Sequence, residues 1–62
     1  MKGQIKSYWV KSGYGFIGTD KEDVFFHITD WHLSEFPEPG MNVSFNLKET
    51  KKGTRAVGIR RL

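Results

Sequence analysis

The sequence predicts an all-β fold, a small closed barrel of five short strands, and three observations support this prediction. Five segments carry β-branched and aromatic residues or alternate between apolar and polar residues, and none has the spacing of an apolar helix face. Polar or glycine-containing turns separate them. The 62 residues include no cysteine, so apolar packing must hold a chain near the lower size limit for independent folding. Closing such a sheet on itself removes its free edges, and we interpret residues 1–62 as one domain.

The first predicted strand covers residues 4–10, which are rich in β-branched and aromatic side chains. Ile5 should face the core. Simple alternation would place Ser7 and Trp9 with Ile5 and would leave Lys6 and Tyr8 on the opposite, ligand-facing side. A β-bulge, which often occurs where a strand bends around a small barrel, would change this order. The sequence leaves both arrangements open.

The next two predicted strands, residues 11–18 and 23–28, form an antiparallel hairpin. Their connection, residues 19–22, is polar and charged throughout, which suits a tight turn. Glycines at positions 13, 15 and 18 interrupt the first of the two strands. Glycine weakens a strand unless another backbone or a ligand must come close to it. The glycines therefore indicate a surface that is approached closely.

Alternation gives this hairpin one face of rings. Tyr14 and Phe16 lie two residues apart, as do Phe25 and His27, so all four should project from the same side. The alternative is that these rings fill the core. Other apolar residues already claim the interior: Ile5, Ile17, Val24, Phe26, Val43, Phe45, Leu47, Val57 and Ile59. We therefore expect Tyr14, Phe16 and Phe25 to form a stacking platform for a flat ligand, because exposed rings favour association unless a ligand covers them.

The second half of the chain supplies a long loop and two more strands. Residues 29–40 show no alternation and contain two prolines, so we expect a loop with one helical turn near residues 30–34. Residues 41–49 alternate cleanly and form the fourth strand. Residues 50–53 turn the chain. Residues 54–62 form the fifth strand, with Val57 and Ile59 inward and the basic residues outward.

The net charge and the N-terminal residues indicate the kind of partner and the location of the protein. Ten Lys and Arg against seven Asp and Glu give a formal charge of +3, which favours a polyanionic partner. The first residues lack the apolar region of a signal peptide, and no stretch is long and apolar enough to cross a membrane. We expect a cytoplasmic protein.

Motifs for other functions lack their structural context. Residues 13–18 match G-x-G-x-x-G, but no helix follows, so we expect no dinucleotide cofactor and no other cofactor. His27 and His32 share no helix or strand face, which argues against a metal site. No carboxylate is paired with a nucleophile or base, and we expect no enzymatic activity.

Two segments resemble a known family. Residues 11–18, KSGYGFIG, are similar to the first ribonucleoprotein motif of the cold-shock domain family, and residues 24–28, VFFHI, are similar to the second. The resemblance extends from Gly3 to about Leu62. It implies a five-stranded antiparallel OB-fold barrel that binds single-stranded RNA and DNA, acts as an RNA chaperone or antiterminator, and is a monomer. It also implies that Lys6 and Lys11 meet phosphates or bases.

The sequence departs from the family pattern at three places. Ser7 stands where the family usually has a stacking tryptophan, and Trp9 would have to replace it from a shifted position. Ile28 stands where a second ring is common. The loop after the third strand is shorter, so neither Trp31 nor Phe36 can be matched to the loop phenylalanine of the family. In an irregular loop over a small barrel, the two rings either plug an open end or extend the platform.

We predict twelve nucleic-acid contacts: Lys6, Tyr8, Trp9, Lys11, Tyr14, Phe16, Phe25, His27, Trp31, Phe36, Lys52 and Arg55. The alternative function is a small β-barrel protein-interaction module that docks a peptide on its aromatic strip. Salt dependence separates the two, because only phosphate contacts release condensed counterions. Duplex-specific DNA binding is a weaker option, since the sequence offers no recognition helix.

Overall fold

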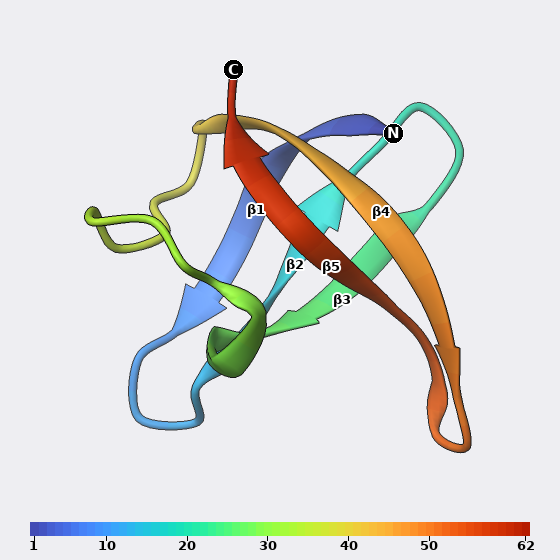
Figure 1. Cartoon of the computed structure of the whole chain (residues 1–62). Coiled ribbons are helices and arrows are strands. Elements are labelled where there is room, and N and C mark those ends of the chain that lie inside the picture. The colour runs from blue at the N-terminus through green and yellow to red at the C-terminus, as the bar shows by residue number, and fades with distance from the viewer.

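The computed structural model describes all residues, 1–62, and shows five strands and one short 3₁₀ turn (Figure 1). The elements are β1 (Lys2–Trp9), β2 (Tyr14–Gly18), β3 (Asp23–His27), η1 (Ile28–Asp30), β4 (Asn42–Thr50) and β5 (Gly53–Arg61). The predicted helical turn therefore exists but begins earlier than expected. No helix here has the length and apolar character needed to cross a membrane.

The strands close into a barrel in the order β1-β2-β3-β5-β4, which confirms the predicted fold class. Neighbouring strands are antiparallel except β3 and β5, which run parallel and pair only at Phe25 and Arg55. Figure 1 shows β4 and β5 crossing in front of the other three strands, with the tip of their hairpin extending past the barrel.

Ten buried residues form the core: Ile5, Ile17, Val24, Phe26, Trp31, Met41, Val43, Phe45, Ala56 and Ile59. Alternation predicted most of them, and it was wrong for Leu47 and Val57. Leu47 lies where the β4–β5 hairpin projects beyond β1, and it is 47% exposed. A bulge in β5 explains Val57. Gly58 has a φ of +59° and adds a residue to the ladder, so Ala56 and Ile59 face inward and Val57 does not.

A second bulge settles the orientation of β1. Ile5 pairs with Ile17, but Ser7 pairs with Phe16, so Lys6 is the extra residue. Beyond this bulge Ser7 and Trp9 share the side of Phe16 and Tyr14. Simple alternation was therefore wrong for Tyr8, whose ring turns toward the core and stacks 6.1 Å from Phe26.

Trp31 plugs the barrel. Only 8% of its surface is exposed, and its ring lies 5.8 Å from that of Phe26. The indole Nε1–H donates a hydrogen bond of 2.6 Å to the carbonyl oxygen of Glu35, and the Glu35 carboxylate pairs with Arg61. The hydrogen bond that the Arg61 guanidinium donates to this carboxylate, together with the negative charge of Glu35, raises the pKa of Arg61 above its usual value. Of the two interpretations that the sequence left open for Trp31, the structure supports the plug.

Candidate functional site

Five ring-bearing side chains lie together on the outer side of β1, β2 and β3, and we call this surface the ring face: Trp9, Tyr14, Phe16, Phe25 and His27. The strand register places them. Tyr14 pairs with Trp9 on one side and His27 on the other, while Phe16 pairs with Phe25. The side chains that alternate with these on β2 and β3, Ile17, Val24 and Phe26, are buried. The hairpin therefore separates core from surface as its alternation predicts.

The four aromatic rings touch one another in a continuous array. Ring centroids lie 5.3 Å apart for Trp9 and Tyr14, 5.6 Å for Tyr14 and Phe25, and 6.0 Å for Phe16 and Phe25. Phe16 stands at 73° to 88° to its three ring neighbours, whereas Tyr14 lies at only 34° to Phe25. Edge-to-face contacts of this kind fix the rings against one another and leave their faces in different directions.

Gly15 supports the ring face from below. A methyl group at this position would lie 2.2 Å from the carbonyl oxygen of Ser7 and 2.8 Å from the ring of Phe26. The missing side chain thus lets the core ring and β1 approach β2 closely. Two larger residues, Tyr14 and Phe16, flank the glycine and point outward. This close approach explains why one of the three glycines between residues 13 and 18 is needed.

The neighbouring 3₁₀ turn fixes His27. The backbone N–H of Thr29 donates a hydrogen bond of 3.2 Å to Nδ1 of His27, and the Thr29 hydroxyl lies 3.0 Å from the same nitrogen. Neutral His27 therefore carries its proton on Nε2. That nitrogen remains a donor for a ligand. His27 and His32 belong to no group of three or more metal-binding side chains.

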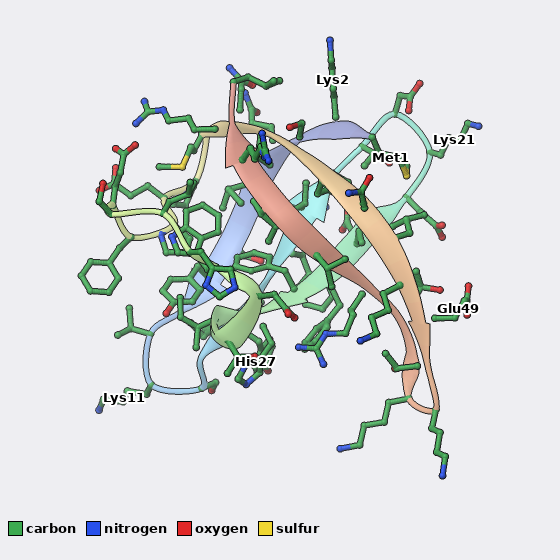
Figure 2. The ribbon with its side chains drawn as sticks, viewed as in Figure 1. Met1, Lys2, Lys11, Lys21, His27 and Glu49 are labelled. Atoms are coloured by element: carbon green, nitrogen blue, oxygen red, sulfur yellow. The ribbon has the colours of Figure 1, made fainter.

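Basic side chains surround the ring face unevenly. Lys6 forms an exposed ion pair with Asp23, with 3.0 Å between Nζ and Oδ2. Lys11 lies in the β1–β2 loop, and Figure 2 shows it at the same end of the barrel as His27. Arg55 is half-buried and pairs with Asp30, so its guanidinium already holds η1 against β5. The predicted backbone contact at Arg55 must compete with this ion pair.

Two grooves flank Phe25. One, of about 420 Å³, is lined by Phe25, His27, Thr50, Lys52, Gly53, Thr54 and Arg55. The other, of about 300 Å³, is lined by Phe16, Glu22, Asp23, Val24, Phe25, Leu47 and Thr54. Leu47 and Thr54 were not predicted to lie at the surface beside the rings. The alternation of residues 41–49 assigned Leu47 to the core, and no local signal showed that the hairpin leaves the barrel there.

Three of the predicted contacts, Tyr8, Trp31 and Phe36, lie apart from the ring face. Tyr8 and Trp31 pack against Phe26 on the inner side. Phe36 is 73% exposed in the loop before β4 and makes no ring contact with the ring face. The structure thus gathers Trp9, Tyr14, Phe16, Phe25 and His27. Lys6 lies at one edge of this group, and Lys52 and Arg55 line the groove beside Phe25 and His27.

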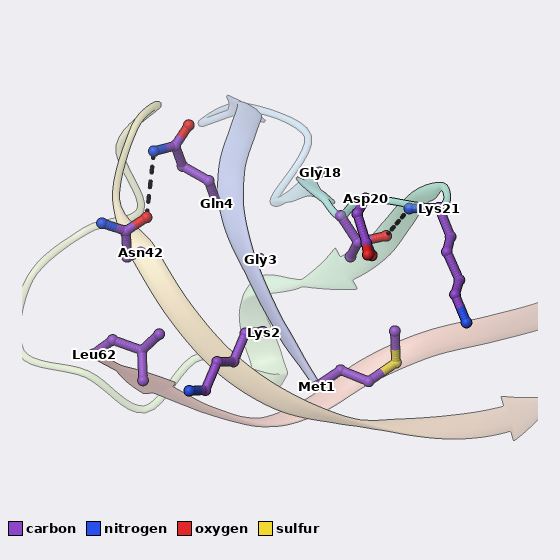
Figure 3. A pocket seen from close by; sticks show the side chains of 10 residues that line it. Met1, Lys2, Gly3, Gln4, Gly18, Asp20, Lys21, Asn42 and Leu62 are labelled. Atoms are coloured by element: carbon purple, nitrogen blue, oxygen red, sulfur yellow. Dashed lines mark hydrogen bonds between the residues drawn. The ribbon is translucent and has the colours of Figure 1, made fainter.

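A wider hollow of about 810 Å³ lies elsewhere (Figure 3). It is lined by the start of β1, the β2–β3 turn, Asn42 and Leu62. Figure 2 places Met1, Lys2 and Lys21 at this end of the barrel, opposite Lys11 and His27. The hollow contains no ring of the array, so we do not include it in the site.

Comparisons with known proteins agree with the fold of the chain. Residues 1–62 match the model of the 'Cold-shock' DNA-binding domain. The chain is 36% identical to the major cold shock protein of Streptococcus pyogenes serotype M6, covering 98% of this chain and 96% of that protein. It is 37% identical to a cold shock-like protein of Aquifex aeolicus, with 95% and 90% covered. The structure of Drosophila Unr CSD456 superposes with a TM-score of 0.79 at 25% identity over 98% of this chain, which spans only 26% of that structure.

Proposed function

The chain belongs to the cold-shock domain family, a nucleic-acid-binding family, and on this premise we propose that the ring face binds single-stranded RNA or DNA by base stacking. Tyr14, Phe16, Phe25 and His27 would contact bases, and Lys6, Lys11 and Lys52 would contact the sugar–phosphate backbone. The protein would act without chemical turnover and as a monomer, as an RNA chaperone or antiterminator that keeps transcripts unpaired.

One observation carries the proposal: Tyr14, Phe16 and Phe25 lie in mutual contact on the outer face of the sheet, where each ring is only partly buried. Each ring can receive one base, and stacking on a protein ring is worth about 1–3 kcal/mol per base. Every base has a flat face, so this mode tolerates many sequences.

The same geometry favours single strands over duplexes. A ring can stack only on a base whose face is free, and in a duplex the neighbouring base pairs cover both faces. The helix-in-groove modes of duplex reading need a helix, whereas the chain has only the three-residue turn η1. A protein that stabilises unstacked bases shifts a folded transcript toward its open form, as an RNA chaperone must.

Binding to fluorescein-labelled oligouridine and oligothymidine of eight nucleotides, measured by fluorescence anisotropy, tests the proposal. We expect the same sequences in duplex form to bind at least about tenfold more weakly. Phe16→Ala and Phe25→Ala should each lose about tenfold or more in affinity for the single strands, because each removes a stacking surface. Leu62→Ala is the control, since it truncates an exposed apolar side chain outside the ring face.

Salt dependence separates this function from peptide docking on the aromatic strip. Each phosphate contact should contribute about −0.7 to the slope of log affinity against log salt for a single strand. A slope near zero, or equal affinity of the two phenylalanine variants and the parent protein, would contradict the proposal.

A further inference from the structure

Trp9 is the largest ring of the ring face and stands at its β1 edge. Its surface is 47% exposed. Its ring centroid lies 5.3 Å from that of Tyr14 and 6.0 Å from that of Phe16. An exposed indole held by two rings is a rigid, flat surface that loses little conformational entropy when a ligand stacks on it.

The indole of Trp9 reaches across the ladder to Phe16, the strand partner of Ser7. In the register, Trp9 pairs with Tyr14, and Ser7 pairs with Phe16. The Trp9 ring nevertheless touches Phe16, so it reaches diagonally from its own ladder position toward the position of Ser7. The serine side chain is too short to fill the space beside Phe16. The Trp9 ring therefore lies beside Phe16, where the side chain of a large residue at position 7 would otherwise lie.

The backbone holds this arrangement in place. The bulge at Lys6 turns Ser7 and Trp9 toward the ring face. At the end of β1, the carbonyl oxygen of Trp9 accepts hydrogen bonds from the N–H groups of Ser12, at 3.2 Å, and Gly13, at 2.9 Å. The side chain is thus fixed at its Cα by the β1–β2 turn and at its ring by Tyr14 and Phe16. Such preorganisation lowers the cost of binding.

We infer that Trp9 is a base-stacking residue that reaches over Ser7, and that positions 7 and 9 compete for one base of the bound single strand. This inference rests on the proposed function of the ring face. It adds a fourth aromatic ring, on β1, to the three on β2 and β3. It also predicts that a second large ring, introduced at position 7 beside Trp9, cannot stack on an additional base.

Four variants test the inference by anisotropy with the labelled octanucleotides. Trp9→Ala should weaken binding about tenfold through the loss of one stacked base. Ser7→Trp should bring no gain in the parent protein, because the two indoles compete. The double variant, Ser7→Trp with Trp9→Ala, should recover most of the lost affinity. Trp9→Phe should fall between the parent and Trp9→Ala. Thermal melts of each variant confirm that it is folded.

Tryptophan fluorescence supplies a readout that a purely structural role of Trp9 would not change. The parent protein should show quenching on addition of an unlabelled octanucleotide. Trp9→Phe retains only Trp31, which is buried in the core, and should bind without quenching. The inference is overturned if folded Trp9→Ala binds as the parent does, if Ser7→Trp and Trp9 contribute additively, or if quenching persists in Trp9→Phe.

Phe16→Ala separates this inference from the proposed function. If Phe16→Ala loses affinity and Trp9→Ala does not, the ring face binds nucleic acid without Trp9, and only the inference fails. If neither variant differs from the parent, the proposed function fails with it.

Discussion

The two faces of the β2–β3 hairpin carry the same residue types for opposite purposes. Phe26 is fully buried between Tyr8 and Trp31, whereas Phe25, its neighbour in the chain, stands half-exposed in the ring face. Aromatic content alone therefore does not distinguish a core from a binding surface. In a strand, successive side chains point to opposite faces, so whether a ring is buried or exposed depends on its position in this alternation. The inner face should therefore govern stability, and the outer face should govern binding.

The largest effect should come from Phe26→Ala. Truncating this fully buried ring should lower the free energy of unfolding by about 3–5 kcal/mol, because the space it leaves cannot be filled. Phe25→Ala should lower it by about 1 kcal/mol or less, since its ring lies on the outer face and is only partly buried. Urea denaturation followed by circular dichroism measures both. Similar losses for the two variants would contradict the division of the hairpin into an inner and an outer face.

A smaller loss of stability should follow Gly15→Ala, which disturbs the boundary between the faces. The added methyl group would press on the carbonyl oxygen of Ser7 and the ring of Phe26, and such overpacking costs about 1–3 kcal/mol.

Gly18→Ala is the matched control for this substitution in the same strand. Its nearest neighbours would lie 3.7 Å from the new methyl group, an ordinary contact, so we expect little change in the unfolding free energy. Equal melting temperatures for both alanine variants would show that β2 and Phe26 do not meet as closely as described.

The smallest effect should appear on the outer face, in the salt dependence of Lys52→Ala. Lys52 lines the groove beside Phe25 and His27, and losing one phosphate contact should reduce the salt slope of single-strand binding by about 0.7. Lys2→Ala, at the opposite end of the barrel, should leave the slope unchanged. A larger change for Lys2 than for Lys52 would place the bound strand away from the ring face.

The sequence was sufficient to predict the all-β barrel and the two faces of the hairpin, because both follow from local alternation. The bulges at Lys6 and Gly58 were harder to predict from the sequence. A bulge depends on how two strands meet, and only the glycine left a visible trace. For this reason Val57 was misassigned, and the sequence left open which way Tyr8 faces. The ion pair of Arg55 with Asp30 joins segments that are far apart in the chain, and composition carries no sign of it.

The positions of the Trp9 and Trp31 side chains could not be predicted from the sequence either. Both are large apolar residues near the ends of predicted strands, and the sequence left the place of each open. The structure separates them by their partners. The Trp31 indole donates its N–H inside the protein, to the Glu35 carbonyl, whereas the Trp9 ring is exposed and packs against Tyr14 and Phe16.

The single pair that joins β3 to β5 also has a consequence for motion. The strands β1, β2 and β3 pair with their neighbours in the chain. The seam between β3 and β5, by contrast, joins distant segments and has only the one ladder pair, Phe25 with Arg55. We expect the amides along this seam to exchange with solvent faster than those between β1 and β2. A bound strand that passes from Phe25 to Lys52 would cross the seam and fasten both sides. Slower exchange there on addition of an oligonucleotide would show that the ligand completes the closure of the barrel.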